Sequence, residues 1–330
     1  MSTNLRSVGI LGTGSYLPAN KVTNFDMEKI VDTSDEWIRT RTGIGARHFA
    51  ADDEATSDMA TKAAIKAMEA AGVTADEIDM IIVGTCTPDM LLPATACLVQ
   101  SNIGAVGCAA FDLETACSGF IYGMEVARNF IACGTYNKVL VIGAEKLSSI
   151  LNFEDRKTCV LFGDGAGAAV LGPVEDGKGI LASELGADGS KGMVLKVDAG
   201  GSRMPATPQT VADRLHSLSM DGSEVFKFAV RIMGSSSMRS IEKAGLTLED
   251  IDFLVPHQAN MRIITSAAKK LKLPIEKVHV NLNEYGNMSA ASVPVALDEA
   301  IRSGKIKEGD KTVLVGFGGG LTWGSCVVQW

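Results

Sequence analysis

The chain has 330 residues, of which 46% are hydrophobic, and a formal net charge of −8 at pH 7. This length allows two units with separate cores, no apolar run approaches the about 18 residues of a membrane-spanning helix, and the negative charge argues against nucleic acid as the main partner. Seven cysteines without paired or metal-like spacing, and a first segment without a signal-peptide pattern, predict a cytoplasmic protein with no disulfide framework, no membrane contact and no metal site.

Near the start of the chain, Gly12–Gly14 resembles the opening of a dinucleotide-binding loop. The third glycine position of that motif holds Leu17, and Pro18 follows where a helix should run. The hypothesis that the chain is a nucleotide-binding oxidoreductase would be supported by this stretch alone. A second glycine-rich stretch, Gly163–Gly167, lacks the Lys-Ser/Thr of a phosphate loop. Both stretches are therefore predicted to be close-packing turns.

The chain contains an internal repeat. The stretch Ala71–Val83, which reads as a helix end, a turn and a buried strand, is matched by Ala244–Pro256 at an offset of 173 (245 − 72 at the glycines). The stretch Lys138–Gly143 is matched by Lys311–Gly316 at the same offset (311 − 138). Two matches at one offset indicate a duplicated unit, and strands alternating with amphipathic helices predict an α/β fold with mostly parallel, helix-covered sheets.

Glycine and charge interrupt the pattern between Pro173 and Lys178. We therefore predict two halves, residues 1–176 and residues 177–330. The second half begins with a stretch rich in Gly, Ser, Met and Pro, Gly186–Asp221, which we expect to run as a long excursion over one face.

One cysteine lies where the local pattern changes. Ala109–Leu113 reads as a short buried strand, and apolar residues then recur at helical spacing from Phe120 to Ile131, so Cys117 falls at the turn into a helix. The first amides and the dipole of a helix stabilise a thiolate, which makes Cys117 a candidate nucleophile. The other cysteines are predicted to be small buried side chains: Cys86, Cys97, Cys108, Cys133, Cys159 and Cys326.

Among the four histidines, His257 follows directly after a buried strand, where side chains line the crevices of open α/β sheets. It is either a site residue or a satisfied structural histidine. His279 alternates with two valines and is expected on the outer face of a strand. Aligning Phe111–Leu113 with Val280–Leu282, with one residue added, places Cys117 opposite Asn287 across a pseudo-twofold axis.

Three stretches resemble the active-site motifs of β-ketoacyl-acyl-carrier-protein synthase III, the condensing enzyme that starts bacterial fatty-acid synthesis: Glu114–Phe120, Val255–Arg262 and Tyr285–Ser292. Asp35–Ile44, Phe162–Ala168 and Gly318–Gly324 match as well. The resemblance covers essentially the whole chain. It implies the thiolase-like fold, with two duplicated α/β halves in a five-layered αβαβα arrangement, and a homodimer.

The resemblance also implies a chemistry and its residues. Cys117 attacks an acyl-CoA, and the backbone N–H groups of Cys117 and Gly319 form the oxyanion hole. Malonyl-acyl-carrier protein then loses carbon dioxide, and His257 and Asn287 donate hydrogen bonds to the resulting enolate. The reaction is a decarboxylating Claisen condensation that yields a β-ketoacyl-acyl-carrier protein. Acyl-CoA is a substrate, and no cofactor is expected.

Substrate contacts follow from the same resemblance. Trp37 and Arg156 would sandwich the adenine of CoA, Arg41 would lie near its phosphates, and Asn260 would lie along its pantetheine arm. Residues 261–273 hold four basic and no acidic residues, which suits an acidic carrier protein. The predicted docking residues are Gln258, Ala259, Asn260, Met261, Arg262, Lys269 and Lys270.

The acyl pocket is expected to involve Leu92 and Phe317. Leu92 stands where some family members have Phe, and it is predicted to admit larger starter groups. Met288 and Leu321 also depart from the family pattern and would reshape the same pocket. The main alternative is a starter enzyme of a polyketide or other secondary-metabolite pathway with the same three catalytic residues. A thiolase would need a second cysteine near Gly316–Gly320, and that stretch has none.

Overall fold

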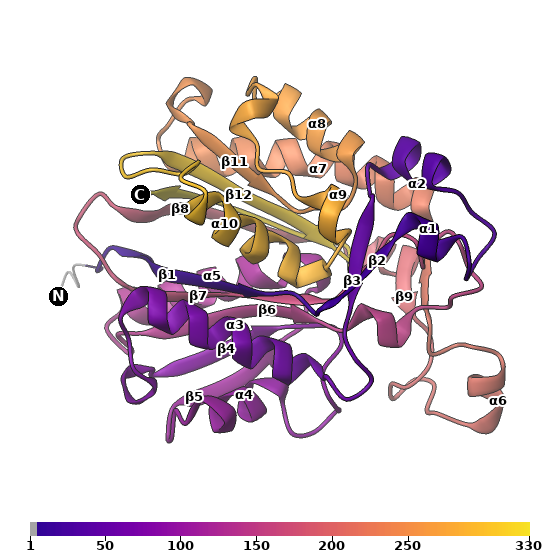
Figure 1. Ribbon diagram of the computed structural model, residues 1–330. Coiled ribbons are helices and arrows are strands. Elements are labelled where there is room, and N and C mark those ends of the chain that lie inside the picture. Colours follow the sequence, from indigo (N-terminus) through magenta and orange to yellow (C-terminus); the bar gives the residue numbers. More distant parts are fainter. Residues whose placement is uncertain (1–4) are drawn as a thin grey trace.

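The computed structural model describes residues 5–330 of the chain. The chain folds into two main β-sheets with helices on their faces (Figure 1). The N-terminal sheet has the strand order β1 (Val8–Tyr16), β7 (Gly165–Pro173), β6 (Val139–Glu145), β4 (Met80–Gly84) and β5 (Ala109–Leu113). The C-terminal sheet has the order β8 (Gly179–Ala187), β13 (Thr322–Gln329), β12 (Lys311–Gly318) and β11 (Phe253–Pro256). Two further strand pairs are short: β2 (Asn20–Thr23) with β3 (Ala46–Phe49), and β9 (Leu195–Val197) with β10 (Leu218–Met220).

The two sheets confirm the predicted duplication. Strands β4 and β11 begin 173 residues apart (253 − 80), and each pairs in parallel with the corresponding neighbour, β6 or β12. In both sheets that neighbour pairs antiparallel with the next strand. The predicted boundary at residue 176 falls between β7 and β8 and stays a prediction.

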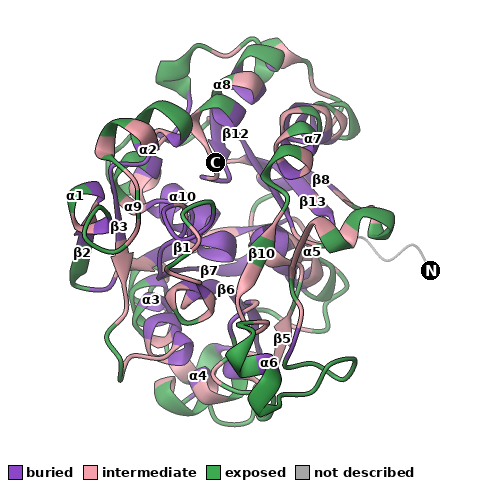
Figure 2. Cartoon of the chain, turned by 90° about the vertical axis from the view of Figure 1, so that its right-hand side faces the viewer, coloured by how far each residue is buried: buried purple, intermediate pink, exposed green. Residues whose placement is uncertain are grey.

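The helices complete five layers (Figure 1). Helix α3 packs on β1 and β7, α5 and α10 lie between the sheets, and α7 packs on β8, β12 and β13. Figure 2 shows the buried residues concentrated in the sheets and in the helices between them, whereas α6 is largely exposed. The αβαβα arrangement is therefore confirmed. The helix bounds are α1 (Asn24–Met27), α2 (Asp35–Thr42), α3 (Thr56–Ala71), α4 (Thr95–Ile103), α5 (Gly119–Ala132), α6 (Pro208–Ala212), α7 (Gly222–Lys243), α8 (Met261–Lys270), α9 (Leu282–Tyr285) and α10 (Ser292–Arg302).

The C-terminal sheet lacks a counterpart of β5, so the strand expected around His279 is wrong. Only an isolated bridge between Leu254 and Val278 forms there. The Gln258 side chain accepts the amide protons of Asn281 and Leu282, which ends strand-like pairing before α9. His279 is buried, with its ring 3.2 Å from Glu299.

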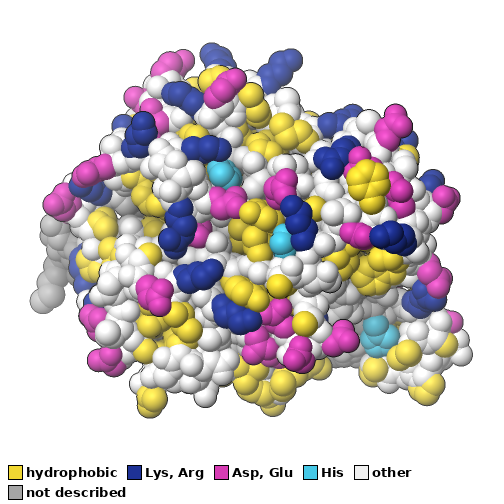
Figure 3. All heavy atoms as spheres, in the orientation of Figure 1, with side chains coloured by type: hydrophobic (Ala, Val, Ile, Leu, Met, Phe, Trp, Pro, Cys, Tyr) yellow, Lys and Arg dark blue, Asp and Glu magenta, His cyan; other side chains and the backbone are white. Residues whose placement is uncertain are grey.

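The surface of the molecule mixes charge types. In the view of Figure 3, basic and acidic side chains are interspersed with apolar ones. The excursion after β8 contains β9, α6 and β10. Within residues 5–330, no helix combines the length and the apolar character that crossing a bilayer requires.

The glycine-rich stretches near residues 12 and 165 pack closely, as predicted, but within strands rather than turns. Gly12 and Gly14 belong to β1, and a Cβ on either would lie 2.4 Å from a backbone nitrogen of α3. Gly167 of β7 likewise faces the backbone of α10. These glycines set the distance between the N-terminal sheet and its helices.

We expect Gly14→Ala to lower the free energy of unfolding by about 3 kcal/mol, since the added methyl group overlaps the α3 backbone, which cannot move without repacking. Denaturant unfolding measures the change. The control is Gly189→Ala, because a Cβ there meets nothing within 4 Å. Equal stability of the two variants would contradict the role given to Gly14.

Candidate active site

Cys117 lies in the turn between β5 and α5, within a 3-10 segment, Ala116–Ser118. Ala116 has φ of 47°, a left-handed conformation that is uncommon without glycine. Burial raises the pKa of the Cys117 thiol to about 12, and a hydrogen bond with Ser289 opposes that rise. The thiol is therefore neutral before substrate binds. Burial therefore opposes the stabilisation of a thiolate that the start of a helix provides.

A glycine loop after β12 approaches this turn. A Cβ on Gly318 would lie 2.5 Å from the Cys117 nitrogen, so only glycine allows this contact. Gly319 lines a cavity together with Cys117. The loop therefore brings its backbone close to Cys117, as an oxyanion hole at that residue would require.

His257 follows the last residue of β11 and is fully buried. Its backbone N–H donates to the carbonyl of Val315 at 2.7 Å, and its ring meets the ring of Phe317 edge-on at 5.4 Å. Neither ring nitrogen has a hydrogen-bond partner. Burial lowers the pKa of His257 to about 3, so the imidazole is neutral at physiological pH. It is not a satisfied structural histidine.

Asn287 is oriented by the backbone around it. Its N–H donates to the carbonyl of Leu161, and its carbonyl accepts the N–H of Gly163. The Ser289 N–H donates to Asn287 Oδ1 at 2.8 Å. The side-chain NH₂ group therefore remains the donor that Asn287 offers to a ligand.

The predicted pairing of Cys117 with Asn287 has the wrong register. Ala116 and Ser289 both have a φ of 47°. Ala116 begins the 3-10 segment before α5, and Ser289 begins the 3-10 segment before α10. Their offset is 173 (289 − 116), so the counterpart of Cys117 is Ala290. The segment before the C-terminal turn is longer than the one before the N-terminal turn. The offset of 169 taken from the strand alignment (280 − 111) therefore does not apply at the turns.

Cys117, His257 and Asn287 nevertheless line one cavity, of about 580 Å³, together with Phe317. Its lining contains no acidic residue. The basic residues of its lining are all exposed, at its outer end: Arg41, Lys157, Lys227 and Arg262. The cavity thus joins a neutral interior to a basic mouth.

A second cavity, of about 470 Å³, also reaches Cys117. Its apolar lining includes Leu147, Ile150, Leu195 and Leu218. Cys117 therefore lies between a cavity with a basic mouth and a cavity with an apolar lining. Phe317, predicted for the acyl pocket, lines the first cavity and not this one; the wall of β12 on which it lies faces His257.

The predicted nucleotide contacts come together around Trp37. The guanidinium carbons of Arg41 and Arg156 lie 5.1 and 5.2 Å from the centre of its ring. A base stacked between two planar groups needs about 7 Å, twice a van der Waals separation. The pair of Trp37 and Arg156 must therefore open to hold adenine. Asn260 caps α8 and donates to the carbonyl of Arg41 at 3.0 Å, which ties this group to the mouth.

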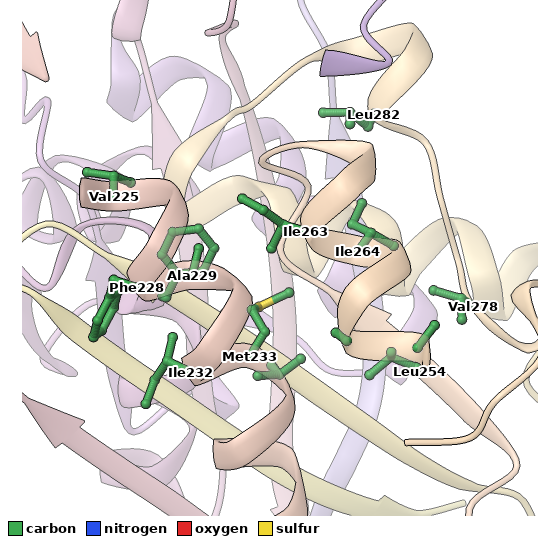
Figure 4. Close-up of a cluster of buried hydrophobic side chains, with 14 of the residues drawn as sticks. Val225, Phe228, Ala229, Ile232, Met233, Leu254, Ile263, Ile264, Val278 and Leu282 are labelled. Carbon is green, nitrogen blue, oxygen red and sulfur yellow. The ribbon is translucent and has the colours of Figure 1, made fainter. Parts of the chain in front are cut away.

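The basic helix is confirmed as α8, which ends at Lys270 because Lys272 adopts a left-handed backbone and Pro274 follows. Its apolar side packs on α7, and Figure 4 shows Ile263 on the side of α8 that faces Ala229 and Phe228. Arg262, Lys269 and Lys270 are exposed, whereas Ala259 and Met261 are partly buried.

Gln258 is the exception among the predicted docking residues. It is fully buried, and its NH₂ group donates to the carbonyls of Pro256 and His279. Its side chain is used within the fold and cannot contact a docked protein, so this prediction is wrong.

Besides Phe317, three positions were expected to shape the acyl pocket. Leu92 is 84% exposed and lines neither cavity of its own chain. Met288 and Leu321 are buried away from both cavities, with the sulfur of Met288 against Gly165. Met288 and Leu321 therefore do not line the pocket.

The prediction missed the contribution of α7 to the mouth. Phe226 and Lys227 line the first cavity, and the Arg262 guanidinium carbon lies 5.0 Å from the centre of the Phe226 ring. The sequence did contain a signal for this contribution. Val225, Phe228 and Ala229 recur at the spacing of one buried helix face, which places Phe226 and Lys227 on a different face of the same helix. The prediction also missed Glu145 and Ser289, behind Cys117.

Two family models match the chain. One described as 3-oxoacyl-[acyl-carrier-protein (ACP)] synthase III matches residues 111–189, and the model of its C-terminal part matches residues 241–330. The β-ketoacyl-[acyl-carrier-protein] synthase III of Clostridioides difficile (strain 630) is 61% identical over 98% of both chains. The crystal structure of 3-oxoacyl-[acyl-carrier-protein] synthase III from Aquifex aeolicus VF5 has a TM-score of 0.91 at 49% identity, covering 98% of this chain and 100% of that chain.

Duplicated halves and a buried cysteine, histidine and asparagine around one cavity define a condensing enzyme of the thiolase-like fold. With these relatives, the chain belongs to the β-ketoacyl-acyl-carrier-protein synthase III family, and it is an acyltransferase. The priming β-ketosynthase of the R1128 polyketide biosynthetic pathway is similar in structure, with a TM-score of 0.92 over 99% of this chain and 97% of that chain, at only 35% identity. The alternative of a polyketide starter enzyme is therefore not favoured.

We expect Gln258→Ala to lower the free energy of unfolding by about 3 kcal/mol, because it leaves buried amide protons of the following loop without their acceptor. Thr265→Ala, an exposed position of α8, is the control and should change stability little. Denaturant unfolding compares them. If Gln258→Ala had the same unfolding free energy as the parent, the structural role given to the Gln258 side chain would be contradicted.

Proposed function

We propose that the chain catalyses the decarboxylating Claisen condensation of a short-chain acyl-CoA with malonyl-acyl-carrier protein, through an acyl-Cys117 intermediate. The product is a β-ketoacyl-acyl-carrier protein, and the reaction initiates fatty-acid synthesis. The observation that carries this proposal is the cavity that joins Cys117, a neutral His257 and Asn287 to a basic mouth.

In the first half-reaction, the Cys117 sulfur attacks the thioester carbonyl of acyl-CoA. The oxyanion that forms accepts hydrogen bonds from the N–H groups of Cys117 and Gly319. CoA leaves, and the acyl group remains on Cys117. The apolar second cavity receives its hydrocarbon end, and no cofactor takes part.

In the second half-reaction, malonyl-acyl-carrier protein enters by the same basic mouth and loses carbon dioxide. His257 and Asn287 donate hydrogen bonds to the enolate oxygen. A neutral imidazole suits this role, because the site then stabilises a transient charge without burying a permanent one. The enolate carbon attacks the acyl thioester, and the new carbon–carbon bond forms.

The mouth serves both substrates. Arg41, Trp37 and Arg156 bind the nucleotide end of CoA, and Asn260 lies along the arm. The acidic carrier protein docks on α8 through Arg262, Lys269 and Lys270, with Ala259 and Met261 at the edge. The exposure of these three cations and the position of Arg262 in the lining of the cavity support this assignment.

The active form is a homodimer. Met90, Leu91 and Leu92 form an apolar segment that is 49%, 88% and 84% exposed in the single chain. A second copy that covers this segment would remove it from water, and Leu92 would then cap the acyl cavity of the partner. Leucine in place of a planar ring leaves room for starters one or two carbons longer than acetyl, at ~0.8 kcal/mol for each buried methylene.

The half-reactions separate the roles of the three catalytic side chains. Cys117→Ser should form no acyl-enzyme, because a hydroxyl lacks the nucleophilicity of sulfur. His257→Ala and Asn287→Ala should still acylate but should release carbon dioxide about 100-fold more slowly, since each loses one enolate donor. Intact-mass spectrometry and malonyl decarboxylation are the measurements. A Cys117→Ser protein that acylates at the parent rate would remove the nucleophile assignment.

Charge reversal on α8 should separate the two substrates. Arg262→Glu should raise the KM for malonyl-carrier protein about tenfold and the KM for acyl-CoA much less, and added salt should shrink the difference because exposed charges are screened beyond ~10 Å at 0.1 M. The control Lys277→Glu makes the same charge change at an exposed site that does not line the cavity. If both variants raised the KM for malonyl-carrier protein equally, the effect would come from the net charge of the protein and not from docking at Arg262.

A further inference from the structure

A buried carboxylate lies behind the nucleophile and has no part in the reaction described above. Glu145 is the last residue of β6 and is fully buried. Its oxygens accept from Thr87 Oγ1 at 2.6 Å, Thr85 Oγ1 at 3.2 Å, and the N–H and S–H of Cys86 at 3.2 to 3.4 Å. Four donors around one carboxyl group are the partners of an ionised carboxylate.

This carboxylate has no counterion. Among residues 5–330, no Lys, Arg or His nitrogen lies within 4.0 Å of it. The adjacent Lys146 turns away and donates to the carbonyls of Ala51 and Glu54. The titratable groups that face Glu145 are Cys86 and Cys117, and Glu114 acts on both thiols. Burial raises the pKa of Glu145, which favours its taking up a proton.

Ser289 connects Glu145 to the nucleophile. The 3-10 segment that begins at Ser289 packs against both β6 and the 3-10 segment of Cys117, and the Ser289 side chain lowers the pKa of both the Cys117 thiol and the Glu145 carboxyl group. Its Oγ lies 4.0 Å from the sulfur of Cys86, which itself donates to Glu145. Ser289, Cys86 and Cys117 line the same cavity.

The backbone of Ser289 indicates that its side chain has a use. Its φ of 47° is a conformation that glycine adopts without steric cost. A serine there retains a strained backbone, and such outliers are concentrated at functional sites. The hydroxyl is the group that a glycine would not supply.

The other nearby base is a weak candidate for the Cys117 proton. Burial lowers the pKa of His257 to about 3, so an imidazolium at that position is strongly disfavoured. Neutral Cys117 must still lose its proton when it is acylated, because the acyl thioester carries none.

We propose that Glu145 takes up the Cys117 proton through the Ser289 hydroxyl during acylation. The thiol proton moves to Ser289 Oγ as the sulfur–carbon bond forms, and the Ser289 hydroxyl proton moves to Glu145. The oxyanion then collapses and expels CoA as a thiolate, which is protonated by water. One buried negative charge is thereby neutralised while CoA carries one away.

The second half-reaction returns the proton. When the enolate carbon attacks the acyl group, Cys117 leaves as a thiolate and regains a proton from Glu145 through Ser289. Glu145 is again ionised, and the enzyme is ready for another acyl-CoA. Glu145 therefore stores the thiol proton for the lifetime of the acyl-enzyme.

The test is the pH dependence of acyl-enzyme formation, measured by rapid quench and intact mass with acetyl-CoA. In the parent enzyme, the rate should rise with pH until Glu145 is ionised and then become constant. In Glu145→Gln, the rate near pH 7 should fall about 100-fold and then increase about tenfold per pH unit, since the thiol must ionise by itself. Ser289→Gly, which keeps the backbone conformation but lacks the hydroxyl, should behave in the same way.

The matched control is Asp164→Asn. Asp164 is another fully buried carboxylate whose pKa is raised by burial, and it accepts from Ser148. Its loss should lower stability and leave the shape of the pH profile unchanged. If Glu145→Gln keeps the parent profile, or loses rate equally at every pH, the proposal is overturned. It rests on Cys117 as the nucleophile, and absence of an acyl adduct on Cys117 in the parent enzyme would instead refute that assignment.

Discussion

Close backbone contact between the strand ends of the N-terminal sheet and the helices between the sheets is the constraint on which the site depends. A Cβ on Gly143 would lie 2.2 Å from the carbonyl oxygen of Ala290, and one on Gly84 would lie 2.9 Å from the backbone of Gly119. Each contact joins a strand end to the start of a helix between the sheets. Without these glycines, the turns before α5 and α10 would separate, and no single cavity would reach Cys117, His257 and Asn287.

The same close packing excludes water and sets the electrostatics of the site. Burial raises the pKa of the Cys117 thiol to about 12 and lowers that of His257 to about 3, so both groups are neutral. The permanent cations stay at the exposed mouth. Such a site suits the proposed reaction, because the exposed cations would attract anionic substrates, while neutral preorganised donors would meet charge only as it develops.

Hydrophobic periodicity and the repeat at 173 predicted two similar α/β halves, because the burial pattern is present in each strand and helix, whereas the five-layered arrangement followed from the family resemblance. The prediction of mostly parallel sheets was wrong, since four of the seven strand pairings in the two main sheets are antiparallel. The same signals failed where a polar side chain replaces a backbone partner. Gln258 was predicted at the surface, yet its amide satisfies the loop in place of a fifth strand. Glu145 was missed because a glutamate at a strand end has no periodic signature, and its role appears only when the sheets bring it near Ser289.

The two turns show how duplication produced different chemistry from one geometry. Ala116 and Ser289 occupy equivalent positions with φ of 47°, so the backbone design is shared. In the N-terminal half the residue after the turn is Cys117, whereas its counterpart in the C-terminal half is Ala290. The C-terminal turn instead uses the left-handed residue itself: the Ser289 N–H donates to the Asn287 side chain, and the Ser289 hydroxyl lowers the pKa of the Cys117 thiol. One turn thus presents Cys117 at the cavity, and the other positions Asn287 and Ser289.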